Sequence, residues 1–351
     1  MKSITLFTDP HLGTDRQAHT TRESAKRLRQ ALFVQAMDVV YNAPHDTFCL
    51  GDLFDKANND EATLLQGYEV ANRCRMTLSG NHDELNREGS VTSLQALAEM
   101  GVAVCAAPDI STPYFDNMGA IYMVPHHASQ ELFEQAIQDA AAHAAETRDG
   151  LASYLMLHCN YDFTLAIEDN TLNLSREFAE EIGDAFDFIF IGHEHNSSTH
   201  MGGKIRVLGN THPTSFHDVG DKFIYHLDLE TAELTEELIW SKAGRYRELK
   251  LGDPIPNLMG VQFIDVRGAG SVEDAAAVSK YINDLWKASE LNGASELLAV
   301  RNKVDIKDSL DGVDIEIEGI TTEDLKTRIT RELEGTELAE LFKELAAEAA
   351  Q

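Results

Sequence analysis

The chain has 351 residues, of which 43% are hydrophobic and 25% are charged, a composition typical of globular proteins that excludes the disordered and fibrous classes. Its 29 Lys and Arg residues against 59 Asp and Glu give a formal net charge of −30, which argues against binding nucleic acid through a long-range positive field. At roughly 150 residues per domain, the length predicts two or three domains.

The cysteines and the apolar segments indicate in which part of the cell the protein works. Cys49, Cys74, Cys105 and Cys159 form no C-x-x-C pair, which excludes a thiolate zinc knuckle and is typical of reduced, intracellular proteins. An Asp occurs at position 9, before a signal-peptide apolar region could form, and no run approaches the ~18 apolar residues of a membrane span. We therefore expect a cytoplasmic protein without membrane partners.

The first two thirds of the chain alternates short apolar runs with longer helical stretches, which predicts a layered α/β or α+β domain. Between residues 22 and 40, Leu28, Leu32, Ala36 and Val39 form one apolar stripe at helical spacing. Strands are expected at residues 4–8, 47–50, 75–78, 121–124, 154–157, 188–191, 205–208 and 223–229. Further helices are expected at residues 90–100, 130–145 and 175–182.

Beyond the first two thirds, the sequence changes in character. Around residues 244–256, the basic stretch of Lys242, Arg245, Arg247 and Lys250 is followed by Pro254 and Pro256, which predicts a domain boundary. Residues 260–266, 297–304 and 313–317 read as strands and residues 272–289 as a helix, which predicts a small α/β module.

The last part of the chain reads as helical. Thr321 or Thr322 is expected to cap a helix, and a break near Gly335 divides the segment into two amphipathic helices. The predicted domains are residues 1–250, 251–320 and 321–351.

Five predicted strands are followed by residues that can bind metal ions. These residues are Asp9, His11, Asp52, Asn81, His158, His193 and His195. Because loops at the carboxyl ends of strands build the sites of α/β sheets, we expect them to converge. Two carboxylates, one amide and four imidazoles suit Mn²⁺, Fe²⁺ or Zn²⁺ better than Ca²⁺. Seven ligands are too many for one closed site, but they are enough for two ions ~3.5–4 Å apart that share a bridging carboxylate.

Each of these motifs alone also occurs in ordinary turns, but their joint order is specific. The order D-x-H, G-D-x-x-D, G-N-H-D, H and G-H-x-H resembles that of the calcineurin-like metallophosphoesterases. The matching positions are residues 9–11, 51–55, 80–83, 158 and 192–195. The resemblance implies a two-sheet β-sandwich flanked by helices, here followed by a small α/β capping domain and C-terminal helices.

The resemblance also implies roles for individual residues. One ion would be held by Asp9, His11, Asp52 and His195, and the other by Asp52, Asn81, His158 and His193, so that Asp52 bridges. His82 would sit over the scissile phosphate and stabilise the transition state or protonate the leaving oxygen. Asp83 would orient His82 or, as an open alternative, cap its loop. No catalytic role is assigned to Asp55.

Within the superfamily, three segments resemble the nuclease subunit of the SbcCD type, including its phage counterparts. These segments are TDPHLG, GDLFD and IRVLGNTHPTSF. The resemblance implies a DNA exonuclease and endonuclease that uses two divalent ions, with Mn²⁺ as the expected ion, in end processing, recombination or repair. It also implies an SMC-like ATPase partner of the SbcC type, gripped by residues 321–351, and a homodimer within a heterotetramer. A phage-encoded chain would work in the host cytoplasm.

Two basic segments are candidates for contact with DNA phosphates. Arg22, Lys26 and Arg29 recur at helical spacing, and Arg245 and Arg247 alternate in an extended stretch. A solvated helix face and a basic linker would produce the same patterns. Residues 101–200 contain 2 basic residues against 16 acidic ones, so the acidity is concentrated away from both segments.

Two other functions remain open at the level of sequence. A small-molecule phosphodiesterase or phosphatase could use the same dinuclear core. A non-catalytic scaffold could keep the fold without chemistry, but such a protein would be expected to lose ligands, and every motif residue is present.

Overall fold

The computed structural model describes residues 3–14, 19–84, 91–110, 112, 114–115, 119–147, 151–162, 171–271, 274–291 and 295–307. The contacts reported below lie within the compact unit Met1–Asp305. The predicted strand at residues 313–317 and the helical segment 321–351 fall outside the described residues. The proposed domain boundaries at residues 250 and 320 stay predictions.

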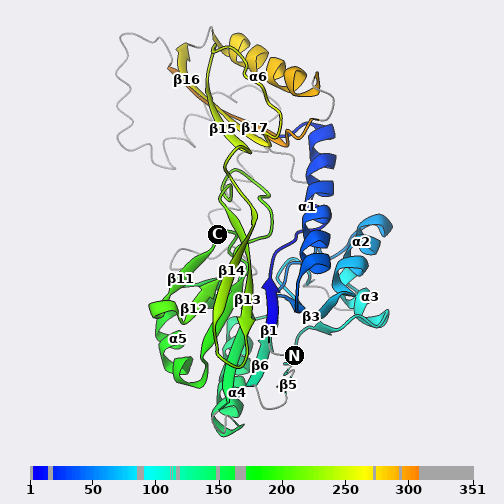
Figure 1. The fold of residues 1–351 in the computed structure, drawn as a ribbon, viewed down its shortest axis with the longest axis vertical. Coiled ribbons are helices and arrows are strands. Elements are labelled where there is room, and N and C mark those ends of the chain that lie inside the picture. The colour runs from blue at the N-terminus through cyan, green and yellow to red at the C-terminus, as the bar shows by residue number, and fades with distance from the viewer. Residues whose placement is uncertain are drawn as a thin grey trace, which may run out of the picture. The chain divides into compact units, whose positions relative to one another are not determined.

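Two six-stranded sheets form the main body (Figure 1). The first has the order β14-β13-β1-β2-β3-β4, with bounds Leu234–Trp240, Lys222–Asp228, Ser3–Phe7, Asp46–Cys49, Cys74–Leu78 and Val104–Cys105. The second has the order β11-β12-β10-β7-β6-β5, with bounds Ser198–His200, Ile205–Val207, Phe188–Gly192, Ala152–His158, Gly119–Val124 and Tyr114–Phe115. In both sheets the central strands run parallel, which brings their carboxyl ends to one edge.

The two sheets pack face to face around a shared core, which confirms the predicted sandwich. Along β7, Tyr154 and Met156 point into this core, whereas Leu155 and Leu157 belong to the cluster on the outer face. Successive side chains of a strand alternate between faces, so a strand covered on both sides reads as a continuous apolar run. This is why the central strands could be located from the sequence.

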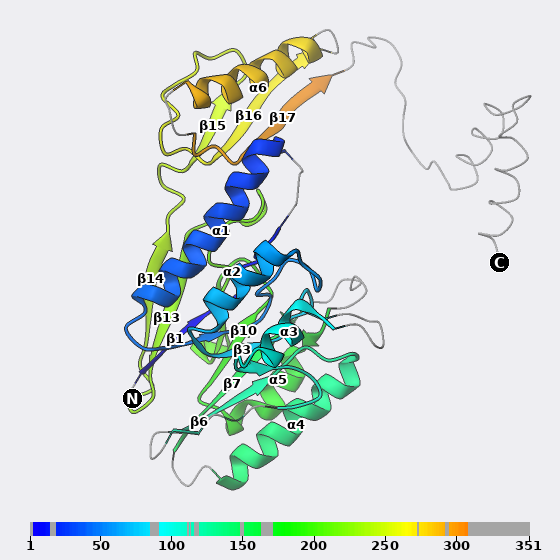
Figure 2. The same cartoon turned by 90° about the vertical axis from the view of Figure 1, so that its right-hand side faces the viewer.

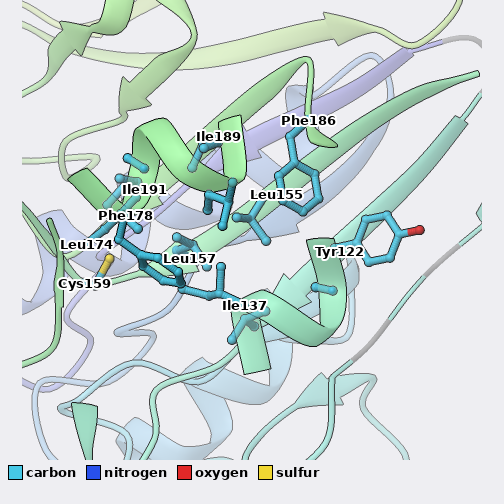
Figure 3. Packing of buried hydrophobic residues seen from close by; sticks show 14 of the residues in the cluster. Tyr122, Ile137, Leu155, Leu157, Cys159, Leu174, Phe178, Phe186, Ile189 and Ile191 are labelled. Atoms are coloured by element: carbon cyan, nitrogen blue, oxygen red, sulfur yellow. The ribbon is translucent and has the colours of Figure 1, made fainter. Parts of the chain in front are cut away.

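Helices cover the outer faces of both sheets. α1 (Arg22–Asn42), α2 (Glu61–Ala71) and α3 (Ser93–Glu99) pack on the first sheet. α4 (Gln130–Thr147) and α5 (Arg176–Ile182) pack on the second, and Figure 3 shows their side chains meeting those of β6, β7 and β10. The predicted helices near α1, α3, α4 and α5 are confirmed. α2 and the strands β4, β5, β11 and β14 were not predicted.

A third, three-stranded sheet follows the sandwich. β15 (Tyr246–Lys250), β16 (Phe263–Ser271) and β17 (Ala299–Lys307) share an apolar cluster with α6 (Ala275–Glu290). β16, β17 and α6 overlap the segments predicted from the sequence. A two-stranded sheet, β8 (Asn160–Tyr161) with β9 (Asn173–Leu174), completes the described strands.

The N-terminal half of α1 joins the sandwich to the third sheet (Figure 2). Leu28 and Leu32 of the predicted apolar stripe pack in one cluster with Trp240, Phe263 and Leu298. Arg27 donates Nε and Nη2 hydrogen bonds to the carbonyl oxygen of Leu297, at 3.2 and 3.1 Å. None of the described helices combines the length and apolar character that crossing a bilayer requires.

Candidate metal centre

The predicted ligands gather at the carboxyl ends of the parallel strands, as the sequence indicates. Asp9 and His11 follow β1, Asp52 follows β2, and Asn81 follows β3 in the first sheet. His158 ends β7 and His193 follows β10 in the second sheet. Among the described residues, the side-chain ligand atoms lie within 4.8 Å of one another in the groups Asp9–His11–His195, Asp52–His158–His193 and His11–Asp55–His82.

The first group is centred on two facing imidazoles. The Nε2 atoms of His11 and His195 lie 2.9 Å apart. Asp9 Oδ1 lies 3.7 Å from His11 Nε2 and is a buried oxygen without a hydrogen-bond partner in the described part of the chain. The other oxygen, Oδ2, accepts a hydrogen bond from the backbone N–H of His193 at 3.0 Å. An unpaired buried carboxylate oxygen beside two ring nitrogens is a donor set that suits a divalent cation.

The second group surrounds the Nε2 atom of His158. Asp52 Oδ2 lies 3.3 Å from this nitrogen and Asn81 Oδ1 lies 3.2 Å from it. His193 Nδ1 lies 3.0 Å from the same Asn81 oxygen. Asp52 Oδ2 is also 3.8 Å from His11 Nε2, so this carboxylate stands between the two groups.

The hydrogen-bond partners of the rings direct their lone pairs inward. His158 donates its Nδ1 hydrogen to the Leu50 carbonyl oxygen at 2.7 Å, and His195 donates its own to Asp218 Oδ2 at 3.2 Å. In His11, Nδ1 lies 3.3 Å from Asp55 Oδ1, beside the carboxylate but outside hydrogen-bond geometry. The Nε2 lone pairs then face each other and the carboxylates, an arrangement that a bound cation stabilises. The residues present therefore fit divalent metal ions.

The charges within the site shift its pKa values. Burial lowers the pKa of His158, but the charge of Asp52 and its hydrogen bond outweigh burial and raise the pKa to about 10. Burial raises the pKa of Asp52, but His158 and His11 hold it well below its usual range. Burial and the neighbouring His158 lower the pKa of His193 to about 4. The site stabilises positive charge next to Asp52.

The loops that carry the ligands are sharply bent. Asp9, His11, Asp52 and His193 have φ values of 55°, 46°, 49° and 89°, in the left-handed region that residues other than glycine rarely adopt. Such conformations persist where the surrounding structure holds them, and they cluster at functional sites. Here the bends turn side chains from both sheets toward one point.

Three motif glycines are required by close packing around the ligands. A Cβ atom at Gly51 would lie 2.2 Å from His158 Nδ1, and one at Gly80 would lie 2.2 Å from Asp52 Oδ1. A Cβ atom at Gly192 would lie 2.5 Å from the Leu50 carbonyl oxygen. The G-D, G-N-H-D and G-H-x-H motifs therefore combine each ligand with a glycine that makes room for it.

His82 lies at the rim of the site, half-buried. Its backbone N–H donates to Asp52 Oδ1 at 2.9 Å, and its Nδ1 donates to the Asp55 carbonyl oxygen at 2.8 Å. Its ring packs edge-on against His11, with centroids 5.1 Å apart. The Asp55 carbonyl therefore sets the orientation of the ring and leaves Nε2 available for chemistry.

Asp83 binds backbone rather than the imidazole that it was expected to orient. It accepts hydrogen bonds from the N–H groups of Gly80, Leu53 and Phe54, at 3.0, 3.3 and 3.1 Å. These contacts correspond to the loop-capping alternative. Burial and the charge of Asp52 raise the pKa of Asp83 to about 8. Asp83 ties the loop of Asn81 and His82 to the loop after Asp52.

Sequence reasoning missed two carboxylates that hold imidazoles. Asp55 was recognised in the G-D-x-x-D motif but given no role. Asp218 was not singled out, since no spacing links it to His195. Besides His195, it accepts hydrogen bonds from Asn210 Nδ2 at 2.7 Å, from the N–H of Thr214 at 2.9 Å and from the N–H of Ser215 at 2.7 Å. Burial opposes ionisation of Asp218, but these partners hold its pKa far below the usual range.

The five predicted DNA-contact residues lie outside the metal centre. Arg22 and Lys26 are exposed on α1, and Arg29 donates to the Thr14 carbonyl oxygen at 2.8 Å. Arg247 is exposed on β15, and the Arg245 guanidinium lies 5.6 Å from the centroid of the Trp240 ring. Their contact with DNA stays a prediction.

Comparison with known families agrees with the geometry of the site. The family model of the calcineurin-like phosphoesterases matches residues 2–197, more than half of the chain. The chain belongs to the calcineurin-like phosphoesterases. As a member of this family it is a hydrolase of phosphoester bonds, and the ligand groups described above are its candidate sites for the divalent metals that such enzymes use.

Solved structures of similar proteins include two phosphoesterases. One is the calcineurin-like phosphoesterase YfkN from Bacillus subtilis, with 13% sequence identity and a TM-score of 0.35, covering 69% of this chain and 91% of that one. Another is a metallophosphoesterase from Sphaerobacter thermophilus, with 14% identity and a TM-score of 0.33, covering 68% and 89%. Comparison with curated proteins gives no match.

Proposed function

We propose that this calcineurin-like phosphoesterase is a DNA exonuclease and endonuclease that uses two divalent ions, with Mn²⁺ as the preferred metal. The position of Asp52 is the main support for two ions. Its Oδ2 lies 3.3 Å from His158 Nε2 and 3.8 Å from His11 Nε2, so one carboxylate oxygen can serve both ligand groups. Asp9, His11 and His195 would complete one site, and Asn81, His158 and His193 the other.

Different residues of the site would bind the metal ions, position the ligand rings and donate a proton. When bound, two ions supply positive charge that offsets the negative charge developing on the phosphate during in-line attack. The carboxylates and imidazoles hold that charge in place, and Asp55 and Asp218 fix the rings of His11 and His195. His82, as the imidazolium, would pass its Nε2 proton to the leaving oxygen and become the neutral ring, while its Nδ1–H stays donated to the Asp55 carbonyl.

The proposal that DNA is the substrate rests on parts of the chain other than the metal ligands. The segments TDPHLG, GDLFD and IRVLGNTHPTSF resemble the nuclease subunit of the SbcCD type. The sheet β15-β16-β17 with α6 follows the sandwich at the position of the capping domain in such nucleases. Arg22, Lys26 and Arg247 are exposed, with Lys26 3.5 Å from Glu23 Oε2, and lie where they can meet phosphates. These features favour DNA over a small phosphodiester.

The decisive experiment is a nuclease assay with Mn²⁺ on defined double-stranded ends, single strands and hairpins. We expect cleavage by the wild-type chain and cleavage slower by roughly 10²- to 10⁴-fold by His82→Gln. The proposal fails if DNA stays intact, with and without an added SMC-like ATPase, while nucleotides or aryl phosphates are turned over rapidly. That result would instead identify a small-molecule phosphodiesterase on the same core.

We further propose that residues 321–351 bind the ATPase subunit and that the nuclease works as a homodimer within a heterotetramer. The acidic chain, with its net charge of −30, has little long-range attraction for DNA, so its partner would supply part of the DNA-binding surface. Removing residues 321–351 should leave nuclease activity on short single strands but abolish co-purification with the ATPase. A truncated chain that still forms the complex would contradict this assignment.

A further inference from the structure

A cavity of about 130 Å³ lies where α1, the loop before β13 and the third sheet meet. We call it the junction cavity. The residues that matter for its chemistry are His19, Thr214, Phe216, Phe263, Ala299 and Arg301. The cavity is therefore built from the sandwich and from the third sheet together, and it is separate from the ligand groups described above.

The walls of the junction cavity are aromatic and cationic. Phe216 packs edge-on against Phe263 and against His19, with centroids 5.5 and 5.8 Å apart. The Arg301 guanidinium lies 4.4 Å from the centroid of Phe216. Asp265 holds Arg301 through two hydrogen bonds of 2.9 Å, so the guanidinium is fixed in place. Rings and a fixed guanidinium are the groups on which nucleobases stack.

The volume of the junction cavity suits a single six-membered aromatic ring. An apolar cavity of about 150 Å³ is large enough to bind benzene. The junction cavity, at about 130 Å³, is of the same order. Its hydroxyl groups add polar character, since Thr214 Oγ1 and Ser215 Oγ donate to Asp218 and keep lone pairs for a further partner.

Thr214 and the ring of His195 stand between the junction cavity and the metal centre. Thr214 lines the cavity, and its Oγ1 lies 3.1 Å from Asp218 Oδ2 and 3.4 Å from His195 Nδ1. The cavity lies on the Nδ1 side of His195 and the ligand groups on its Nε2 side, so a nucleoside attached to a phosphodiester held there would have to span this ring and Thr214 to reach the cavity. The loop that positions His195 is also the wall of the cavity.

We infer that the junction cavity receives the base of a nucleotide adjoining the scissile phosphate. This inference rests on the proposed nuclease function and adds where the substrate base lies. A base can enter only after it leaves its stack, which costs least at strand ends and in single strands. The enzyme should accordingly act on unpaired nucleotides before paired ones.

The test compares two single-stranded DNA oligonucleotides of equal length. One is unmodified, and the other carries abasic residues at its two terminal positions on both ends, which removes the base whatever the polarity of cleavage. With Mn²⁺, we expect the wild-type chain to release the first nucleotide from the unmodified strand with a kcat/KM on the order of tenfold higher. Equal values would overturn the inference but leave the nuclease function standing. Cleavage of neither strand would refute the nuclease function itself.

A cavity-filling variant provides the second test. Ala299 is a buried residue of the cavity wall, away from the ligand groups, and Ala299→Leu places three more carbon atoms in the cavity. The variant should lower kcat/KM for the unmodified strand to the level of the abasic strand and leave the abasic strand unaffected. Ala243→Leu, at an exposed position, is the matched control and should keep the wild-type preference. An Ala299→Leu enzyme that still prefers the unmodified strand to the abasic strand would contradict the inference. If this variant does not fold, the comparison of the two strands with the wild-type chain decides the question.

Discussion

The Nε2 atoms of His11 and His195 lie 2.9 Å apart, while the other nitrogen of each ring lies beside a carboxylate, Asp55 or Asp218. The pair of carboxylates holds the two rings so that their lone pairs converge. Removing a carboxylate that holds the second nitrogen of a metal-binding imidazole typically lowers metal affinity by roughly 10- to 100-fold. The rings of His11 and His195 are thus prepared by the fold for a shared cation.

Asp218→Asn should therefore weaken Mn²⁺ binding by about 10- to 100-fold, because the amide cannot accept all the hydrogen bonds that converge on Asp218. Calorimetric titration with Mn²⁺ measures the change, and circular dichroism checks the fold. Asp139→Asn, on the exposed face of α4, is the control and should bind as the wild type does. Unchanged affinity in Asp218→Asn would show that its hydrogen bond to His195 does not tune the site.

Substitutions at His82 and Asp52 should separate chemistry from metal binding. His82→Gln should lower kcat by roughly 10²- to 10⁴-fold with metal content near normal, since the side chain acts on the leaving oxygen. Asp52→Asn should lose metal from both sites, because its Oδ2 adjoins both ligand groups. Metal analysis of the purified variants, alongside turnover, checks the contrast. Equal metal loss in the two variants would refute the separate roles.

Gly80→Ala should disable the site through steric conflict alone. The new Cβ atom would lie 2.2 Å from Asp52 Oδ1 and 2.7 Å from His158 Nε2, so two ligands of the second group must shift. Displacing a catalytic group by about 1 Å can cost about 10²-fold in rate, which is the loss expected in kcat/KM. Gly183→Ala, whose Cβ atom would meet no other atom closer than 3.8 Å, should retain wild-type activity. A fully active Gly80→Ala enzyme would mean that the site tolerates this displacement.

His212 should make the stability of the protein depend on pH. Burial lowers its pKa to about 4 and outweighs its hydrogen bond to the Pro213 carbonyl. Between that value and the unfolded value of about 6.5, only the unfolded chain binds the proton, so stability falls as the pH falls. Above pH ~6.5, His212 is neutral in both the folded and the unfolded chain and costs no stability. By pH ~4, its protonation in the unfolded chain lowers the free energy of unfolding by about 3 kcal/mol.

Urea unfolding of wild type and His212→Gln at a series of pH values between 4.5 and 7.5 measures this effect. The wild type should lose more free energy of unfolding on acidification than the variant, which lacks the titrating group. The variant should start from lower stability, since the His212 ring packs edge-on against Trp240 at 5.7 Å. Parallel pH profiles for the two proteins would exclude His212 as the source.

The sequence by itself determined a layered α/β domain, its central strands and the set of candidate ligands, and the resemblance to the phosphoesterases implied the sandwich. Central strands such as β7 are covered on both faces, so their continuous apolar runs could be recognised without the structure. The ligands follow these strands directly, and each motif glycine marks a place where the backbone approaches another ligand. This information is local, because strand periodicity and turn chemistry act over a few residues.

Only the tertiary structure decided which groups orient the ligands and which elements meet around the site. Asp218 contacts His195 across 23 residues of sequence, and Arg301 reaches Phe216 from the third sheet. Asp83 likewise binds backbone of the preceding loop instead of the neighbouring His82. Such pairings depend on how whole elements pack. No local pattern of side chains encodes them, because the free energy that selects them comes from burial and hydrogen bonding between distant segments.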